Sequence, residues 1–129
     1  MSADTLTRAR LTSFAPQFLV DDLGGAIVYY RDKLGFKFGE PYEGFYAIGT
    51  RDGLELHLKE APKLAGEREH RHKNEHLDAY AGVDDIEAFH DECRARGAKI
   101  IKPLAARPWG TRDFYVEGPE GYVIAFSGS

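Results

Sequence analysis

The feature that most constrains the fold is an internal repeat, because the second half of the chain repeats the motif order of the first. Residues 20–23 (VDDL) recur as residues 83–86 (VDDI), and each copy opens a run whose apolar residues have the spacing of one buried helix face. Gly35 and Gly97 suit the left-handed position that ends a helix. Self-similarity of this kind predicts two structural units with the same topology.

Each predicted helix is followed by segments typical of β-strands. Residues 52–58 (DGLELHL) are echoed by residues 120–126 (EGYVIAF), a turn that leads into an alternating strand. In the first of these strands we expect Leu54, Leu56 and Leu58 to face the helix, and Glu55 and His57 to line a cavity on the opposite face. The predicted strands are residues 14–20, 36–40, 44–49, 54–60, 77–81, 98–102, 112–117 and 122–127.

Two finer expectations concern where elements begin. Pro16 has no backbone N–H to donate, so the first strand should begin irregularly or lie at a sheet edge. Asp84 and Glu87 have the spacing of a capping box, which predicts Asp84 at the start of the second helix.

The predicted element order is βαβββ, present twice. We expect an α+β fold in which two tandem βαβββ modules form curved mixed sheets around a pocket, with the helices on the outer face. The chain of 129 residues forms one domain, with the first module at residues 11–60, a linker at residues 61–75 and the second module at residues 76–127.

Composition and charge argue against several classes of protein. The net charge of -4 argues against a nucleic-acid partner, which would require clustered Lys and Arg. No stretch approaches the roughly 20 apolar residues of a membrane span, and the N-terminus has no apolar signal segment, so we predict no membrane association and a cytoplasmic location. The single cysteine, Cys93, falls in a helical pattern and is predicted to be a core residue.

Several motifs together resemble the vicinal oxygen chelate superfamily, which includes glyoxalase I, extradiol dioxygenases and bleomycin-resistance proteins. They are residues 18–23 (FLVDDL), 29–36 (YYRDKLGF), 108–110 (PWG), 113–116 (DFYV) and 118–122 (GPEGY). The PWG segment, followed by a strand and a Gly-Pro-Glu-Gly turn, is most similar to the bleomycin-resistance branch, whose members sequester a cationic antibiotic without transforming it. Gly118 departs from the family pattern, which usually has Asp at this position.

The resemblance also implies where a metal ion would be bound. Metal enzymes of the family take ligands from four places, which correspond here to Ala15, His57, Asp78 and Ala125. Neither alanine can bind a metal, and a catalytic ion normally has three protein ligands. We therefore predict no metal cofactor; the alternative is one divalent metal ion held by His57, His76 and Asp78, the composition of a facial triad.

Without a metal, the second face of the sheets still offers a mixed lining for a small molecule. Trp109 and Tyr80 would stack on a planar or cationic ligand, and Asp78 and Glu55 would pair with its positive charge. One of Phe45 and Tyr46 should face the pocket, since neighbours on a strand point to opposite sides, and the sequence leaves open which one. The predicted ligand-binding residues are Gln17, Phe45, Tyr46, Glu55, His57, Asp78, Tyr80 and Trp109.

Three functions are consistent with this reading. The favoured one is a metal-free small-molecule-binding protein of the glyoxalase/bleomycin-resistance type that sequesters a cationic or aromatic antibiotic. The alternative is a metal-dependent lyase, isomerase or dioxygenase of the same superfamily, and the third is a metal-free enzyme with Glu55 or Asp78 as base. The resemblance further implies a homodimer, the commonest assembly of soluble proteins.

Overall fold

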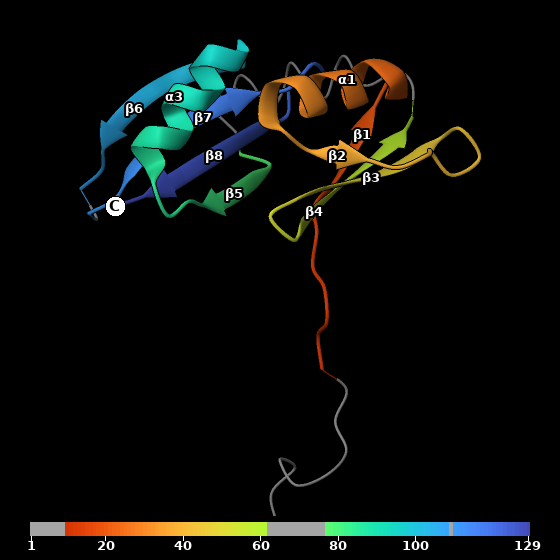
Figure 1. Cartoon of the computed structure of the whole chain (residues 1–129), viewed down its shortest axis with the longest axis horizontal. Helices are drawn as coiled ribbons and strands as arrows, with labels where there is room; N and C mark the ends of the chain where they lie inside the picture. The colour runs from red at the N-terminus through yellow and green to blue at the C-terminus, as the bar shows by residue number, and fades with distance from the viewer. Residues whose placement is uncertain (1–9, 62–76, 109) are drawn as a thin grey trace, which may run out of the picture.

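The structure, a computed structural model, describes residues 10–61, 77–108 and 110–129, and it consists of two similar halves (Figure 1). The first half contains β1 (Gln17–Val20), α1 (Leu23–Leu34), β2 (Lys37–Phe38), β3 (Tyr46–Arg51) and β4 (Leu54–Glu60). The second half contains β5 (Ala79–Gly82), α3 (Ile86–Arg96), β6 (Lys99–Ala106), β7 (Arg112–Glu117) and β8 (Val123–Gly128). The predicted α+β fold with a βαβββ order in each half is confirmed.

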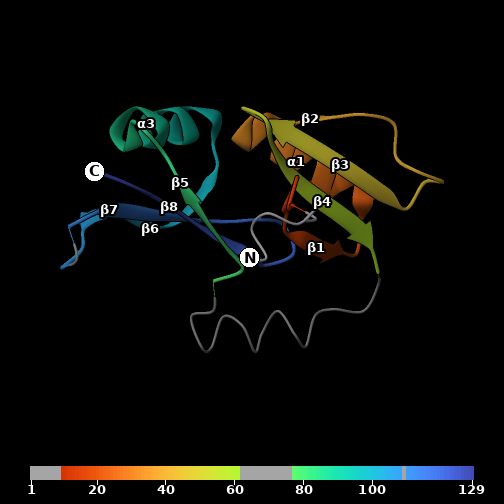
Figure 2. The ribbon, with the colours of Figure 1, turned by 90° about the horizontal axis from the view of Figure 1, so that it is seen from below.

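Each half forms one four-stranded mixed sheet. The strand orders are β1-β4-β3-β2 and β5-β8-β7-β6, and the parallel pairs are β1 with β4 and β5 with β8. In Figure 2 the helices α1 and α3 lie side by side, and each covers the sheet of its own half. The predicted linker, residues 61–75, lies outside the described residues except for Ala61.

The helix ends follow from local hydrogen bonds. The αL positions at Gly35 (φ 78°) and Gly97 (φ 81°) confirm the predicted helix ends. The predicted capping box is wrong by one residue, because the side chain of Asp85, not Asp84, accepts the backbone N–H of Ala88 at 3.1 Å.

The observed strands differ from the predicted ones mainly at their ends. β1 begins at Gln17, after Pro16, whose carbonyl accepts the N–H of His57 at 3.0 Å. Residues 10–16 run away from the sheet, and the Leu11 and Phe14 side chains are 92% and 93% exposed (Figure 1). β2 is shorter than predicted, β3 and β5 begin two residues later, and β6 continues to Ala106.

The core lies between each sheet and its helix. Leu56 and Leu58 are buried as predicted, but Leu54 is 66% exposed and does not pack under α1. Leu54 is the first residue of β4, directly after the turn at Gly53, so it lies at the end of the sheet. The alternation rule gives the face on which a side chain lies but not whether a helix reaches it.

Two neighbouring tyrosines of α1 connect the first half to the second. The Tyr29 hydroxyl donates to the carbonyl of Glu117 at 2.7 Å and accepts the N–H of Lys99 at 2.9 Å. Tyr30 is 1% exposed, and its hydroxyl lies against Gly118, where an added Cβ would overlap it. A glycine is therefore required at the position where the family pattern has Asp, which accounts for that departure.

Further contacts connect the two halves on either side of Tyr29 and Tyr30. The Phe18 and Tyr122 rings stack with centroids 4.4 Å apart, and the Tyr122 hydroxyl accepts the N–H of Leu19 at 3.0 Å. Arg51 forms two hydrogen bonds with Glu92, at 2.9 and 3.0 Å. Among the described residues, no helix is long and apolar enough to cross a membrane.

We predict that Gly118→Ala lowers the free energy of unfolding by about 1–3 kcal/mol, the usual cost of overpacking a filled site. Tyr30→Phe alone should change it by less than about 1 kcal/mol, because the buried hydroxyl has no hydrogen-bond partner among the described residues. In the Tyr30→Phe background the cost of Gly118→Ala should fall. Urea unfolding measures the two single variants and the double variant. The control is Gly39→Ala, because a Cβ added there meets no atom within 4 Å. If the cost of the double variant equals the sum of the two single costs, the contact between Tyr30 and Gly118 is contradicted.

Burial gives a second prediction, on alkaline stability. The Cys93 side chain is fully buried, and burial raises the pKa of its thiol to about 12 from an ordinary 9.0. Burial likewise raises the pKa of Tyr29 and Tyr30. All three groups favour folding while protonated, so the free energy of unfolding should fall as pH rises above about 9. Cys93→Ala should remove the first part of this fall in urea titrations across pH, and an unchanged slope would contradict the assignment.

Candidate functional site

Four predicted site residues form one hydrogen-bonded row on the face of the first sheet that is opposite α1. The Gln17 side-chain amide donates to the Tyr46 hydroxyl at 2.8 Å. That hydroxyl lies 2.8 Å from Nδ1 of His57, whose Nε2 lies 2.9 Å from a carboxylate oxygen of Glu55. We call these residues, Gln17, Tyr46, His57 and Glu55, the polar row.

One protonation state of His57 satisfies every contact in the polar row. The Glu55 carboxylate only accepts, so His57 carries its proton on Nε2 and donates it there. The unprotonated Nδ1 then accepts from the Tyr46 hydroxyl, whose oxygen is free to accept from Gln17. Both ring nitrogens are therefore used, and the row ends in a Glu55 carboxylate whose second oxygen has no partner among the described residues.

The structure places Tyr46, and not Phe45, in the polar row. Tyr46 begins β3 and is half-buried against His57, with the two rings edge-on at 5.6 Å. Phe45 precedes the strand, is 37% exposed and packs edge-on against Tyr42 and Tyr46. The sequence did not decide between them because it does not give the residue at which β3 begins.

The corresponding face of the second sheet carries aromatic and basic residues. Tyr80, Ala125 and Tyr115 lie side by side on β5, β8 and β7. Tyr80 is 59% exposed, whereas Ala125 is fully buried. Lys102 and Arg107 lie 5.7 and 5.6 Å from the Tyr115 ring centroid. The sequence did not predict either cation. For Lys102 the reason is that two register shifts interrupt the β6–β7 pair, so the two-residue alternation does not give the face on which its side chain lies.

Asp78 has a structural contact that the sequence did not indicate. Its carboxylate accepts the N–H of Val123 at 2.9 Å, while its own N–H donates to the Val123 carbonyl at 2.8 Å. This pair fixes the start of β8 against the chain that leads into β5. This contact uses one of the lone pairs of the Asp78 carboxylate.

The residues at the family's metal positions do not fit a metal ion. Ala15 and Ala125 have no side-chain donor atom and both nitrogens of His57 are hydrogen-bonded, which leaves Asp78 as the one carboxylate at these four positions. Within residues 10–61, 77–108 and 110–129, no three His, Cys, Asp or Glu side chains gather as a metal site would require. The alternative ligand His76 and the predicted site residue Trp109 lie outside the described residues.

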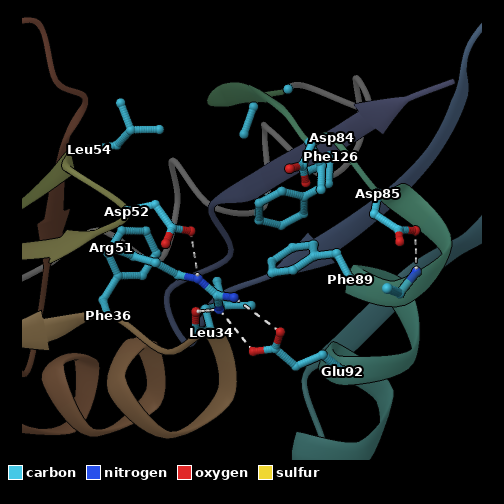
Figure 3. Close-up of a pocket in the computed structure, with 14 residues that line it drawn as sticks. Leu34, Phe36, Arg51, Asp52, Leu54, Asp84, Asp85, Phe89, Glu92 and Phe126 are labelled. Atoms are coloured by element: carbon cyan, nitrogen blue, oxygen red, sulfur yellow. Dashed lines mark hydrogen bonds and ion pairs between the residues drawn. The ribbon is translucent and has the colours of Figure 1, made fainter.

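A separate groove of about 510 Å³ lies between the two halves, where β5, α3 and the β3–β4 turn meet (Figure 3). Its lining includes Leu54 and none of the predicted ligand-binding residues that the structure describes. No local signal in the sequence marks it, because its walls come from four segments that are 15 to 34 residues apart. The lining residues are Leu34, Phe36, Arg51, Asp52, Leu54, Ala81, Gly82, Val83, Asp84, Asp85, Ala88, Phe89, Glu92 and Phe126.

Solved structures with this fold cover nearly the whole chain. A glyoxalase/bleomycin resistance protein/dioxygenase from Nocardioides is 22% identical, with a TM-score of 0.68 over 97% of this chain and 87% of that one. The bleomycin-binding protein of the bleomycin producer Streptomyces verticillus, in complex with copper(II)-bleomycin, is 20% identical. Its TM-score is 0.73 over 95% of this chain and 99% of that one. These similarities concern the fold.

Sequence comparison agrees with the structural similarity. The chain is 28% identical to the uncharacterized protein YwbC of Bacillus subtilis (strain 168) over 115 residues, which cover 84% of this chain and 90% of YwbC. The family model of the Glyoxalase/Bleomycin resistance protein/Dioxygenase superfamily matches residues 10–126. The resemblance inferred from the motifs is thereby confirmed, and the chain belongs to the glyoxalase/bleomycin resistance protein/dioxygenase superfamily.

Proposed function

We propose that this protein binds a small organic molecule on the face that carries the polar row, without using a metal ion. The observation that carries the proposal is the polar row itself, in which His57 gives both nitrogens to Tyr46 and Glu55. A histidine binds a metal ion through the lone pair of an unprotonated ring nitrogen, and here the lone pair of His57 Nδ1 accepts a hydrogen bond from the Tyr46 hydroxyl. The row is therefore arranged for hydrogen bonding.

The chemistry of the polar row favours a ligand that donates hydrogen bonds or carries positive charge. At its ends the row offers acceptors, namely the second Glu55 oxygen and the amide oxygen of Gln17. Tyr80 on the second sheet adds an exposed ring on which a planar group can stack. These features support sequestration of a cationic or aromatic antibiotic, and a relative with the same fold is named for binding bleomycin.

The proposal includes a homodimer and a cytoplasmic location. Large apolar side chains are exposed on the polar-row face and on the segment before β1, with Ile48 44%, Tyr80 59% and Phe14 93% exposed. Covering them with a second copy would remove apolar surface from water and close the binding face. Sedimentation velocity should then give a species of twice the chain mass, and a monomer at every concentration would contradict this part.

Binding is tested by calorimetric titration of metal-free bleomycin into protein treated with a chelator and dialysed. Binding should persist after chelation, and Glu55→Gln should weaken it by about fivefold, the upper range for a partly exposed ion pair. Glu40→Gln removes the same charge from an exposed loop position and should leave the affinity unchanged.

Two outcomes would overturn the proposal. If the chelated protein, without bleomycin, takes up a divalent metal ion and His57→Ala abolishes that uptake, the metal-dependent alternative is correct. If Glu55→Gln and Glu40→Gln have equal effects, the ligand responds to net charge and not to the polar row.

A further inference from the structure

The groove between the two halves has the size and lining of a ligand site, and it is separate from the polar row. Its volume of about 510 Å³ falls within the roughly 300–1,000 Å³ of small-molecule pockets. Leu54 lines the groove and points to the helix side of β4, whereas Glu55 and His57 point to the opposite side of the sheet. A molecule bound there would not touch the polar row.

The walls of the groove are mainly apolar and aromatic. Phe89 and Phe126 lie edge-on with ring centroids 4.8 Å apart, and Phe36 faces them from the first half (Figure 3). Leu54 adds a side chain that is 66% exposed although it belongs to a strand. Exposed apolar surface between rings is costly in water, so an apolar ligand body would be stabilised here.

The charged groups of the groove are predominantly acidic. Arg51, the one cation among the described lining residues, is already paired with Glu92 through two hydrogen bonds and also donates to the Leu34 carbonyl at 2.7 Å. Its guanidinium lies 4.9 Å from the Phe89 ring centroid. The hydrogen bonds from Arg51 hold the pKa of the Glu92 carboxyl below its usual range, and Arg96 also donates to this carboxylate at 2.9 Å, so Glu92 is shared by two guanidinium groups.

Three further carboxylates in the groove are not neutralised in this way. Asp84 has no hydrogen bond or ion pair with any described residue. Asp85 uses one oxygen to cap α3, and Asp52 makes a single 3.4 Å contact with Arg51 while remaining 82% exposed. Figure 3 shows Asp52 and Asp84 on opposite sides of the apolar floor. The groove therefore combines an apolar floor with a negatively charged rim.

From this charge pattern we propose that the groove is a second binding site, which takes an organic cation with an aromatic or branched apolar body. The body lies on Phe89, Phe126 and Leu54, and the cationic centre lies between Asp84 and Asp52. Carboxylates stabilise the cation by Coulomb attraction, and the phenylalanine faces add a cation–π contribution. An anion would meet only the Arg51 guanidinium, which is already paired.

A matched pair of probes tests the charge requirement: N-methylacridinium, a permanent cation, and acridine, studied above its own pKa, where it is neutral. Both are titrated by calorimetry, and ¹⁵N–¹H spectra locate the site. N-methylacridinium should bind more tightly, and the shifted signals should belong to β5, the start of α3 and the β3–β4 turn. Signals that move only at Gln17, Tyr46 and Glu55 would place the probe on the polar row and overturn the proposal.

Variants separate the charge contribution from the apolar one. Asp84→Asn should weaken N-methylacridinium about two- to fivefold and leave acridine unchanged, as for a rim ion pair. Leu54→Ala should weaken both probes. The control is Asp91→Asn, which removes the same charge from an exposed position of α3 outside the groove. Equal effects of Asp84→Asn and Asp91→Asn on the cation would overturn the proposal.

A blocking variant tests the groove without disturbing the fold. A Cβ added at Gly82 meets no atom within 4 Å, and Gly82 lines the groove, so Gly82→Leu fills it from an open position. Binding of both probes should be lost while the urea-unfolding midpoint stays near that of the parent protein. Unchanged probe binding would overturn the proposal. Bleomycin titration of the same variant distinguishes the two sites, because the polar-row proposal predicts no change there.

Discussion

The contact between the α1 tyrosines and the turn after β7 determines how the two halves are placed. Tyr29 satisfies two backbone groups of the second half, the Glu117 carbonyl and the Lys99 N–H. Tyr30 fills the adjacent space so completely that Gly118 cannot carry a side chain. These two hydrogen bonds and the close packing of Tyr30 against Gly118 leave little freedom for one half to move against the other.

The position of the contact made by Tyr29 and Tyr30 explains why a groove remains between the two halves. Tyr29 and Tyr30 lie in the second turn of α1 and bring it against β6 and β7. The end of α1 and the β3–β4 turn contact α3 through the Arg51–Glu92 pair and through Arg96, which donates to the Asp32 carbonyl. The Arg51–Glu92 pair connects the halves there, but long charged side chains fill space less completely than apolar ones. Leu54, Phe36 and Phe89 are therefore left around an opening and not packed against one another.

The fold was predictable because its determinants are local or periodic. The repeated VDDL and VDDI motifs, the glycines at 35 and 97 and the two-residue alternation of β4 each depend on neighbours within one turn or one strand. The contacts that the sequence did not give are long-range. Asp78 meets Val123, 45 residues away, and Tyr46 reaches His57 across a strand pair. Their partners depend on register, which pattern alone does not fix.

His57 lies at a position where metal enzymes of the family have a metal ligand, but here both of its ring nitrogens form hydrogen bonds. A metal ion organises a histidine by taking one nitrogen and leaving the other to a hydrogen-bond partner. Here the Tyr46 hydroxyl takes the place that an ion would need, and Glu55 holds the second nitrogen, as an outer-shell carboxylate would. With alanine at two of the other three positions, an ion would have to displace Tyr46 and would gain few ligands in return. The hydrogen-bonded row uses both nitrogens of His57, and it presents an acceptor-rich, half-exposed surface on this face of the sheet.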